Sequence, residues 1–334
     1  MKKIGKQTIL FENPPSISEC FTIVGPKESQ GPLSSFFDKT LDDEFWGEKS
    51  WEKAESKILK ETINSLILKS NTALSDIDLI FSGDLLNQCI SSNFGIRNLS
   101  IPLFGTFGAC STFVEAMSLS AICVESFAKN CICATSSHFC SAEKQFRFPL
   151  ELGNQRPQTS QWTVTGAGAS LISKHSKAPF IKSITPGKIV DLGIKDANNM
   201  GAAMAPAFVD TLITHLKDTN RPVSYYDLIF SGDLGYVGKE LAIDLARQEN
   251  LDLSKNYEDC GVLIFNKDTQ DTHSGGSGCA CSASVFSSLI FDKLKNNEYK
   301  KILLIATGAL MNSTTSQQGE SIPAIAHAID IECD

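Results

Sequence analysis

The chain has 334 residues, of which 42% are hydrophobic, and its formal net charge is −8 at pH 7. This length and apolar content are enough for a full hydrophobic core, and the acidic balance without a Lys/Arg cluster argues against a nucleic-acid partner. The N-terminal residues are too polar for a signal peptide, and no segment reaches the roughly 20 apolar residues of a membrane span. We therefore expect a soluble protein, or one attached peripherally to a membrane.

The first predicted elements, in chain order, form one α/β unit. Apolar residues lie on one stripe of 51–69, as in an amphipathic helix, and the octapeptide DLIFSGDL at 78–85 has the pattern of a strand entering a tight turn. A small-residue segment with a cysteine follows at 108–113. A buried strand is expected at 131–139 and a closing strand at 163–172.

The same octapeptide returns at 227–234, which is 149 positions later (227 minus 78). It again follows a helical pattern, at 205–216, and precedes a small-residue segment with cysteines at 278–283. A second buried strand is expected at 302–310 and a second closing strand at 322–331. Eight identical residues in a row indicate an internal repeat, and an internal repeat dictates the architecture.

The repeat predicts an α/β fold made of two duplicated halves, 1–180 and 181–334, each with a largely parallel sheet. Any functional site is expected between the halves.

The chain has eleven cysteines, but we expect neither a disulfide framework nor a metal framework. The count is odd and no export signal is present, which favours a reducing compartment. Cys131/Cys133 and Cys279/Cys281 are CxC pairs, whose spacing is weak evidence for zinc. Cys110 differs, because it lies where a strand leads into a helix. Helix N-terminal N–H groups can lower the pKa of a thiol, so Cys110 is either a nucleophile or part of a tight strand–helix junction.

A duplicated α/β half with a cysteine at this elbow resembles the thiolase superfamily, and within it the ketoacyl synthase III-like enzymes. The resemblance implies a layered αβαβα fold and, in the enzymes, condensation of acyl thioesters by the cysteine with two second-half residues. Ser231-Gly232-Asp233-Leu234 stands where the synthases have His-Gln-Ala-Asn, and Gly276-Ser277-Gly278-Cys279 stands where they have Gly-Asn-Thr-Ser. We therefore expect a protein without this catalysis, and an acyltransferase using Cys110 is the alternative.

Longer strings along the whole chain resemble the stage V sporulation protein AD family. They lie at 83–88, 108–112, 135–149, 161–169, 199–206, 257–261, 275–283 and 317–328. The resemblance implies binding of dipicolinic acid (pyridine-2,6-dicarboxylate), its uptake into the developing spore and its release on germination. It also implies small membrane proteins of the same operon as partners, and a place at the spore inner membrane. No cofactor is expected, and calcium enters only as part of a calcium-dipicolinate ligand.

A planar dicarboxylate needs hydrogen-bond donors and a cation around a dry pocket, and arginine suits carboxylates best. The residues expected to supply such contacts are Cys110, Ser136, Ser137, His138, Arg147, Arg156, Ser277, Gly278, Gly319, Glu320 and His327. Alternatively, the loop with both arginines packs against a second subunit of a homodimer, and the arginines pair with Glu143 and Glu151. A scaffold with a vestigial pocket is a third possibility.

Other polar residues are expected to be structural. His327 shares a strand face with Ile325 and Ile329, which predicts a buried ring with one hydrogen bond. The remaining histidines of loops and helices, His175, His215 and His273, are expected to be solvated. Asp84 and Asp233 are expected to hold the two repeated turns through local bonds, since two lone aspartates fall short of a calcium site.

Overall fold

The computed structural model describes residues 1–146, 155–174 and 176–334. Its strands form two sets of five that are connected in the same way. The first set has the order β3-β9-β7-β5-β6 and the second has the order β10-β15-β14-β11-β12. Strand β5 is parallel to both of its neighbours, and so is β11. Strands β9 and β15 are antiparallel to both of theirs, so each sheet is mixed and the prediction of largely parallel sheets was wrong. The two sets meet where β10 pairs with β3, at Phe180 and Ser16.

The sequence predicted the bounds of six of these ten strands, β5, β7, β9, β11, β14 and β15, and those bounds agree closely with the observed ones. The first set comprises β3 Ser16–Val24, β5 Leu79–Gly83, β6 Leu103–Gly105, β7 Asn130–Ser137 and β9 Gly166–Ser173. The second set comprises β10 Phe180–Thr185, β11 Leu228–Ser231, β12 Tyr257–Asp259, β14 Lys301–Ala309 and β15 Ala324–Glu332. Short additional strands are β1 Lys2–Ile4, β2 Thr8–Leu10, β4 Lys39–Thr40, β8 Trp162–Thr163 and β13 Gly276–Ser277.

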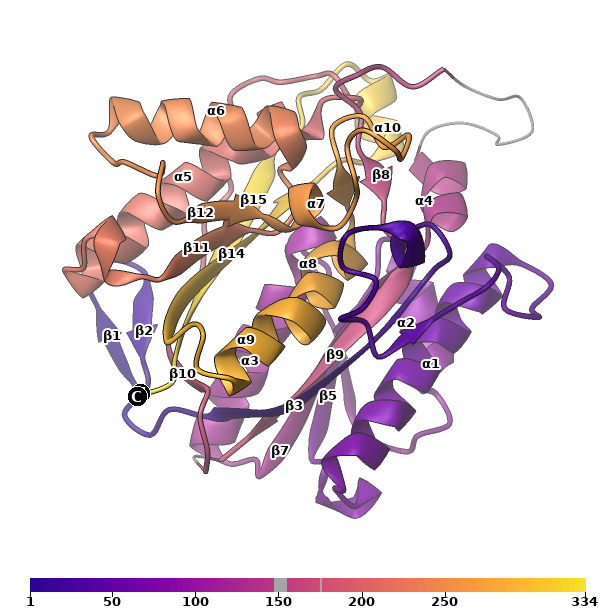
Figure 1. Ribbon diagram of the computed structural model, residues 1–334, viewed down its shortest axis with the longest axis vertical. Helices are drawn as coiled ribbons and strands as arrows, with labels where there is room; N and C mark the ends of the chain where they lie inside the picture. Colours follow the sequence, from indigo (N-terminus) through magenta and orange to yellow (C-terminus); the bar gives the residue numbers. More distant parts are fainter. Residues whose placement is uncertain (147–154, 175) are drawn as a thin grey trace.

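Helices cover both sets of strands and also lie between them (Figure 1). The first half contains α1 Trp51–Ser70, α2 Ile90–Ile96, α3 Thr112–Ser126 and α4 Phe139–Phe146. The second half contains α5 Met200–Thr219, α6 Gly235–Gln248, α7 Cys260–Leu263, α8 Cys279–Val285, α9 Phe291–Lys295 and α10 Ser313–Gln317. Helix α5 begins earlier than expected, because Asn199 caps it by accepting a hydrogen bond from the Ala202 N–H.

Three clusters of buried side chains correspond to the helix layers. Helix α1 packs on the first sheet, α5 and α6 pack on the second, and α3 and α8 fill the space between the sheets. The repeated octapeptides show how the pattern works, because successive strand residues point to opposite faces. Phe81 and Phe230 belong to the central cluster, whereas Ile80 and Ile229 face the outer helices. The result is a five-layered αβαβα arrangement, as the resemblance to the thiolase superfamily implied.

Matching polar contacts support the duplication. Helices α1 and α5 both span 20 residues and end at an asparagine in the left-handed conformation, Asn71 and Asn220. Asp78 and Asp227, the first residues of the octapeptides, each accept hydrogen bonds from two backbone N–H groups at the start of the neighbouring strand. The two halves therefore share local detail as well as strand order.

Two of the histidine predictions were wrong. The His215 side chain is fully buried on α5, between the Thr185 hydroxyl at 2.8 Å and the Tyr226 hydroxyl at 2.6 Å. Burial lowers the pKa of His215 to about 3, so the ring is neutral. His273 is largely buried and lies 2.8 Å from the Asp271 carboxylate. His175 lies outside the described residues.

Candidate functional site

Cys110 lies at the elbow that the sequence predicted. Residues Ala109–Ser111 form one 3₁₀ turn that leads directly into α3. Strand β14 of the second half passes close beneath this turn, because a Cβ added to Gly308 would lie 2.2 Å from the Gly108 carbonyl oxygen. Only glycine fits there, and this close approach places a first-half cysteine against second-half residues.

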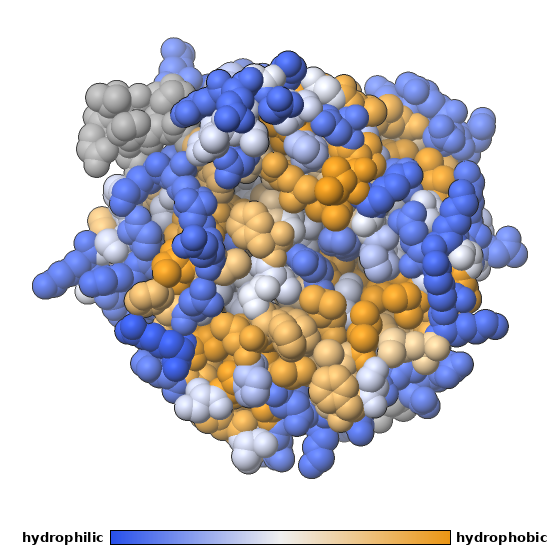
Figure 2. Space-filling view, turned by 180° about the vertical axis from the view of Figure 1, so that it is seen from behind, coloured by the Kyte–Doolittle hydropathy of each residue, from blue (hydrophilic) through white to orange (hydrophobic). Residues whose placement is uncertain are grey.

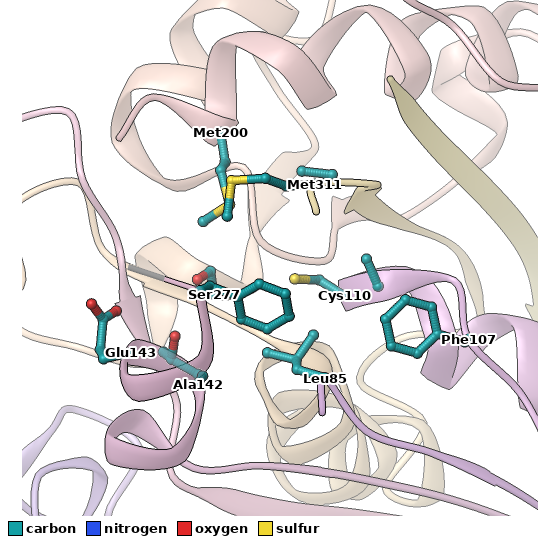
Figure 3. Close-up of a pocket in the computed structure, with 12 residues that line it drawn as sticks. Leu85, Phe107, Cys110, Ala142, Glu143, Met200, Ser277 and Met311 are labelled. Atoms are coloured by element: carbon teal, nitrogen blue, oxygen red, sulfur yellow. The ribbon is translucent and has the colours of Figure 1, made fainter. Parts of the chain in front are cut away.

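A small cavity of about 50 Å³ opens beside the Cys110 side chain (Figure 3). Both halves of the chain contribute to it, as the repeat predicted. The first half supplies Leu85, Phe107, Ala109, Cys110, Ala142, Glu143, Phe146 and Thr163. The second half supplies Met200, Ser277, Ala309 and Met311. The lining is mainly apolar, and none of these described residues carries a positive charge.

The thiol of Cys110 lies beside the buried carboxyl of Asp233. Burial and the nearby Asp233 raise the pKa of Cys110 well above its usual value, although the Gly278 N–H acts in the opposite direction. N–H groups at a helix N-terminus can lower the pKa of a thiol, but at Cys110 their effect does not prevail. Desolvation inside the molecule outweighs the few N–H groups at the turn, so the thiol stays protonated at neutral pH.

Asp233 connects the two halves at the base of the site. Its carboxylate accepts hydrogen bonds from the Thr307 hydroxyl at 2.8 Å and from the Gly278 N–H at 3.2 Å. Burial raises the pKa of Asp233 to about 7. The prediction that Asp233 caps its own turn was wrong, because Asp259 accepts the N–H groups of Leu234 and Gly235 instead.

The first copy of the turn behaves as predicted. Asp84 accepts hydrogen bonds from the Leu86 N–H at 2.9 Å, and from both the N–H and the hydroxyl of Ser92. It is electrostatically coupled to the buried Glu55 carboxyl, whose pKa burial raises to about 8. This part of the first half therefore contains a pair of buried acids behind the Leu85 wall of the cavity.

Of the residues predicted to bind a ligand, Cys110 and Ser277 line the cavity, and Gly278 lies directly behind it through its bond to Asp233. The expected donors on β7 point elsewhere. The Ser136 hydroxyl donates to the Glu55 carboxylate at 3.2 Å, and the Ser137 hydroxyl donates to the Val164 carbonyl at 2.7 Å.

Two further predicted residues, His138 and Arg156, do not line the cavity. The His138 ring is 2.8 Å from the Glu44 carbonyl oxygen, and Arg156 contacts the Asp271 carbonyl and lies over the Trp162 ring. Arg147 lies outside the described residues.

The predicted turn and strand near the C-terminus also lie apart from the cavity lining. Gly319 and Glu320 are exposed after α10. His327 accepts one hydrogen bond from the Gly187 N–H at 3.1 Å, as the strand pattern predicted, and burial lowers its pKa to about 4.

Sequence reasoning missed most of the cavity. Leu85, Phe107 and Met311 are ordinary apolar residues of loops, and their spacing carries no sign of a pocket. The sequence indicated Asp233 only as a residue of the repeated turn and not as part of the site. Glu143 was considered only as a partner for an arginine, although its side chain lines the cavity.

Solved structures define the class of protein. The chain superposes on a variant of OleA of Xanthomonas campestris with a TM-score of 0.61 at 14% identity, over 97% of this chain and 99% of that one. For 3-oxoacyl-[acyl-carrier-protein] synthase III of Aquifex aeolicus VF5 the TM-score is 0.55 at 12% identity, over 95% and 99% of the two chains. At such low identity these similarities establish the thiolase-like fold alone.

The particular family follows from sequence. The family model of Stage V sporulation protein AD matches residues 5–332. Stage V sporulation protein AD of Bacillus subtilis (strain 168) is 46% identical over 333 residues, covering 99% of this chain and 98% of the relative. The chain belongs to the Stage V sporulation protein AD family. In the part that the structure describes, no helix combines the length and apolar character needed to cross a membrane.

Proposed function

We propose that this protein binds dipicolinic acid in the cavity beside Cys110, without catalysis, and supports its uptake into the developing spore and its release on germination. The observation that carries the proposal is the cavity itself, which is apolar and lies between the two halves. Its lining includes the rings of Phe107 (Figure 3) and Phe146. A planar pyridine ring suits such walls, because aromatic rings stack face to face or edge to face.

The charge of the lining indicates which form of the ligand is bound. A dianion buried without a cation would lose its hydration without compensation. The described lining residues offer no cation, and they include the Glu143 carboxylate. The calcium chelate of dipicolinate is neutral, and calcium accepts further oxygen ligands. A neutral chelate fits the described lining, so we propose that dipicolinate binds there as its calcium chelate; the oxygen-bearing side chains of that lining are Glu143, Thr163 and Ser277.

The absence of catalysis rests on the state of Cys110. A condensing enzyme needs a thiolate, or a base that produces one. Here the thiol is buried beside Asp233, and the carboxyl raises the pKa of the thiol instead of lowering it. The alternative is an acyltransferase that uses Cys110, and it is favoured by the elbow position of the cysteine. A stable acyl-enzyme that forms on incubation with acyl thioesters and disappears in Cys110→Ser would establish that alternative.

We propose that the protein acts peripherally at the spore inner membrane with small membrane proteins of the same operon, and that it forms a homodimer. The face opposite to that of Figure 1 carries a broad apolar area (Figure 2). Strand β6 ends the first sheet, and the exposed large hydrophobic residues on and around it are Ile90, Phe94, Phe104 and Phe107. Apolar exposure of this kind at an open sheet edge favours pairing with another chain.

Isothermal titration with dipicolinate, with and without calcium, tests the binding proposal, with isophthalate as a control that lacks the ring nitrogen. We expect saturable binding of the calcium chelate and little binding of isophthalate. Cys110→Trp should abolish binding by filling the cavity, and Glu143→Gln should weaken binding of the chelate more than that of free dipicolinate. Glu320→Gln, at an exposed turn, is the matched control. Equal titrations for the wild type and Cys110→Trp would place the ligand elsewhere.

A further inference from the structure

A second group of chemically active side chains lies outside the lining of the cavity. Glu44 comes from the loop that precedes α1, His138 follows β7 directly, and Cys140 lies in the first turn of α4. One ligand atom from each of these three residues lies within 4.8 Å of the other two. Two segments that are 94 positions apart in the chain thus bring a carboxylate, an imidazole and a thiol together.

The Glu44 side chain is 33% exposed, but one of its two carboxylate oxygen atoms is buried. The Glu44 Oε2 atom is buried, has no hydrogen-bond partner among the described residues, and lies 3.7 Å from His138 Nε2. The His138 side chain is fully buried. A buried carboxylate oxygen without a donor is costly, and a cation placed between it and the imidazole would remove that cost.

Burial and hydrogen bonding set the protonation state of the three residues in the metal-free protein. Burial lowers the pKa of His138, so its ring is neutral. Its Nδ1 accepts the Cys140 N–H at 3.2 Å, and its Nε2 therefore donates to the Glu44 carbonyl. Burial and the neighbouring Glu44 and Glu143 carboxylates raise the pKa of Cys140 to about 12. A divalent cation would reverse this, because a coordinating thiol is deprotonated.

We propose that Glu44, His138 and Cys140 bind one divalent cation of the zinc type. A nitrogen, an oxygen and a sulfur donor form a set that zinc accepts and that calcium and magnesium do not favour. Zinc holds its donor atoms at roughly 2.0–2.3 Å. To share one ion at that distance, the three donor atoms must move about 1 Å closer to one another. Three protein ligands leave the fourth position to water.

Binding has a defined proton balance. The Cys140 thiol releases its proton to solvent, and the cation replaces the proton on His138 Nε2. That ring proton moves to Nδ1, which gives up its contact with the Cys140 N–H. The hydrogen bond from His138 Nε2 to the Glu44 carbonyl is also lost. The new metal–ligand bonds offset the loss of these two hydrogen bonds. One proton is therefore released for each cation bound.

The site is separate from the cavity but shares a helix with it. Ala142 and Glu143, which line the cavity, follow Cys140 in α4. A cation that joins this helix to the Glu44 loop would hold the wall of the cavity in place. The inference goes beyond the proposed function, because it concerns a different ligand at a different site.

The experiment is titration of metal-free, reduced protein with Co²⁺ alone and with Zn²⁺ alone, in the absence of dipicolinate, which is itself a chelator. We expect one equivalent of metal, an increase in the unfolding temperature, and the near-ultraviolet thiolate-to-cobalt absorption. Cys140→Ser should remove this absorption, and Glu44→Gln should weaken binding by at least about tenfold. Cys123→Ser is the matched control, since Cys123 is also a half-buried free cysteine.

Each outcome decides the proposal. Cobalt absorption that survives in Cys140→Ser would overturn it, and so would equal loss in Cys140→Ser and Cys123→Ser. Wild-type protein that takes up no metal would leave the three residues as a hydrogen-bonded structural contact and likewise overturn it. All three variants keep the buried His138 unchanged, and circular dichroism can confirm that they fold. None of these outcomes depends on whether dipicolinate binds.

Discussion

The buried carboxyl of Asp233 should make the stability of the protein depend on pH. Its pKa is raised from 3.8 to about 7 by burial. A carboxyl whose folded pKa is raised stabilises the fold fully below its unfolded pKa, and this stabilisation is lost as pH rises through the folded value. In an experiment from pH 5 to pH 8, this loss therefore takes place between pH 5 and the folded pKa of about 7, over about two pH units. At 1.36 kcal/mol per unit, Asp233 alone should cost about 3 kcal/mol of unfolding free energy.

Asp233→Asn tests this reasoning, because asparagine has the shape of the protonated acid and cannot ionise. Its oxygen can accept from the Gly278 N–H only when its NH₂ group faces Thr307, whose hydroxyl must then accept instead of donate, so a constant loss of about 1–3 kcal/mol is expected at every pH. The pH dependence is therefore the informative quantity. In urea unfolding at pH 5, 6, 7 and 8, the wild type should lose about 3 kcal/mol more than Asp233→Asn over this range.

The control is Asp218→Asn, because the pKa of Asp218 is lowered by hydrogen bonds from backbone N–H groups in the folded protein. That carboxylate stabilises the fold at neutral pH, and its contribution disappears on acidification below its unfolded pKa. Asp218→Asn should therefore leave the pH 5–8 profile unchanged. Parallel profiles for the wild type and Asp233→Asn would refute the argument that Asp233 holds a proton near neutral pH.

Three further predictions concern the elbow and the core. Alkylation of Cys110 by iodoacetamide should be slow in the wild type and faster in Asp233→Asn, which removes a negative neighbour; mass spectrometry of the labelled peptide measures both rates. Gly308→Ala should lower the unfolding temperature because the new Cβ meets a backbone oxygen, whereas Gly105→Ala, in open space, should not; equal melting curves would contradict this. Phe230→Ala, in the central cluster, should cost about 3–5 kcal/mol in urea unfolding, and a loss below 1 kcal/mol would show that the inner layer is loosely packed.

Much of the fold could be predicted from the sequence because its evidence is local. The octapeptide repeat predicted two equivalent halves, and apolar runs predicted their buried strands. The elbow at Cys110 was also predictable, because small residues between a strand and a helix allow the backbone to make a tight turn. These features depend on residues that lie near one another in the chain.

Most of the site could not be predicted, because its residues meet only when the two halves pack. Phe107 and Met311 line one cavity although they come from different halves. His215 lies on a helix with charged neighbours, and only the fold shows that its ring is enclosed by Thr185 and Tyr226. Glu44 and His138 are brought together in the same way.

The two octapeptides separate what the sequence determines from what only the tertiary structure decides. Their eight identical residues determine the same strand, the same turn and the same division between inner and outer faces. Yet Asp84 holds its own turn, whereas Asp233 reaches Thr307 and the thiol of Cys110. A strand and its turn follow from short-range sterics and alternation. The partner of a buried carboxyl depends on which distant segments surround it, and only the tertiary structure decides that.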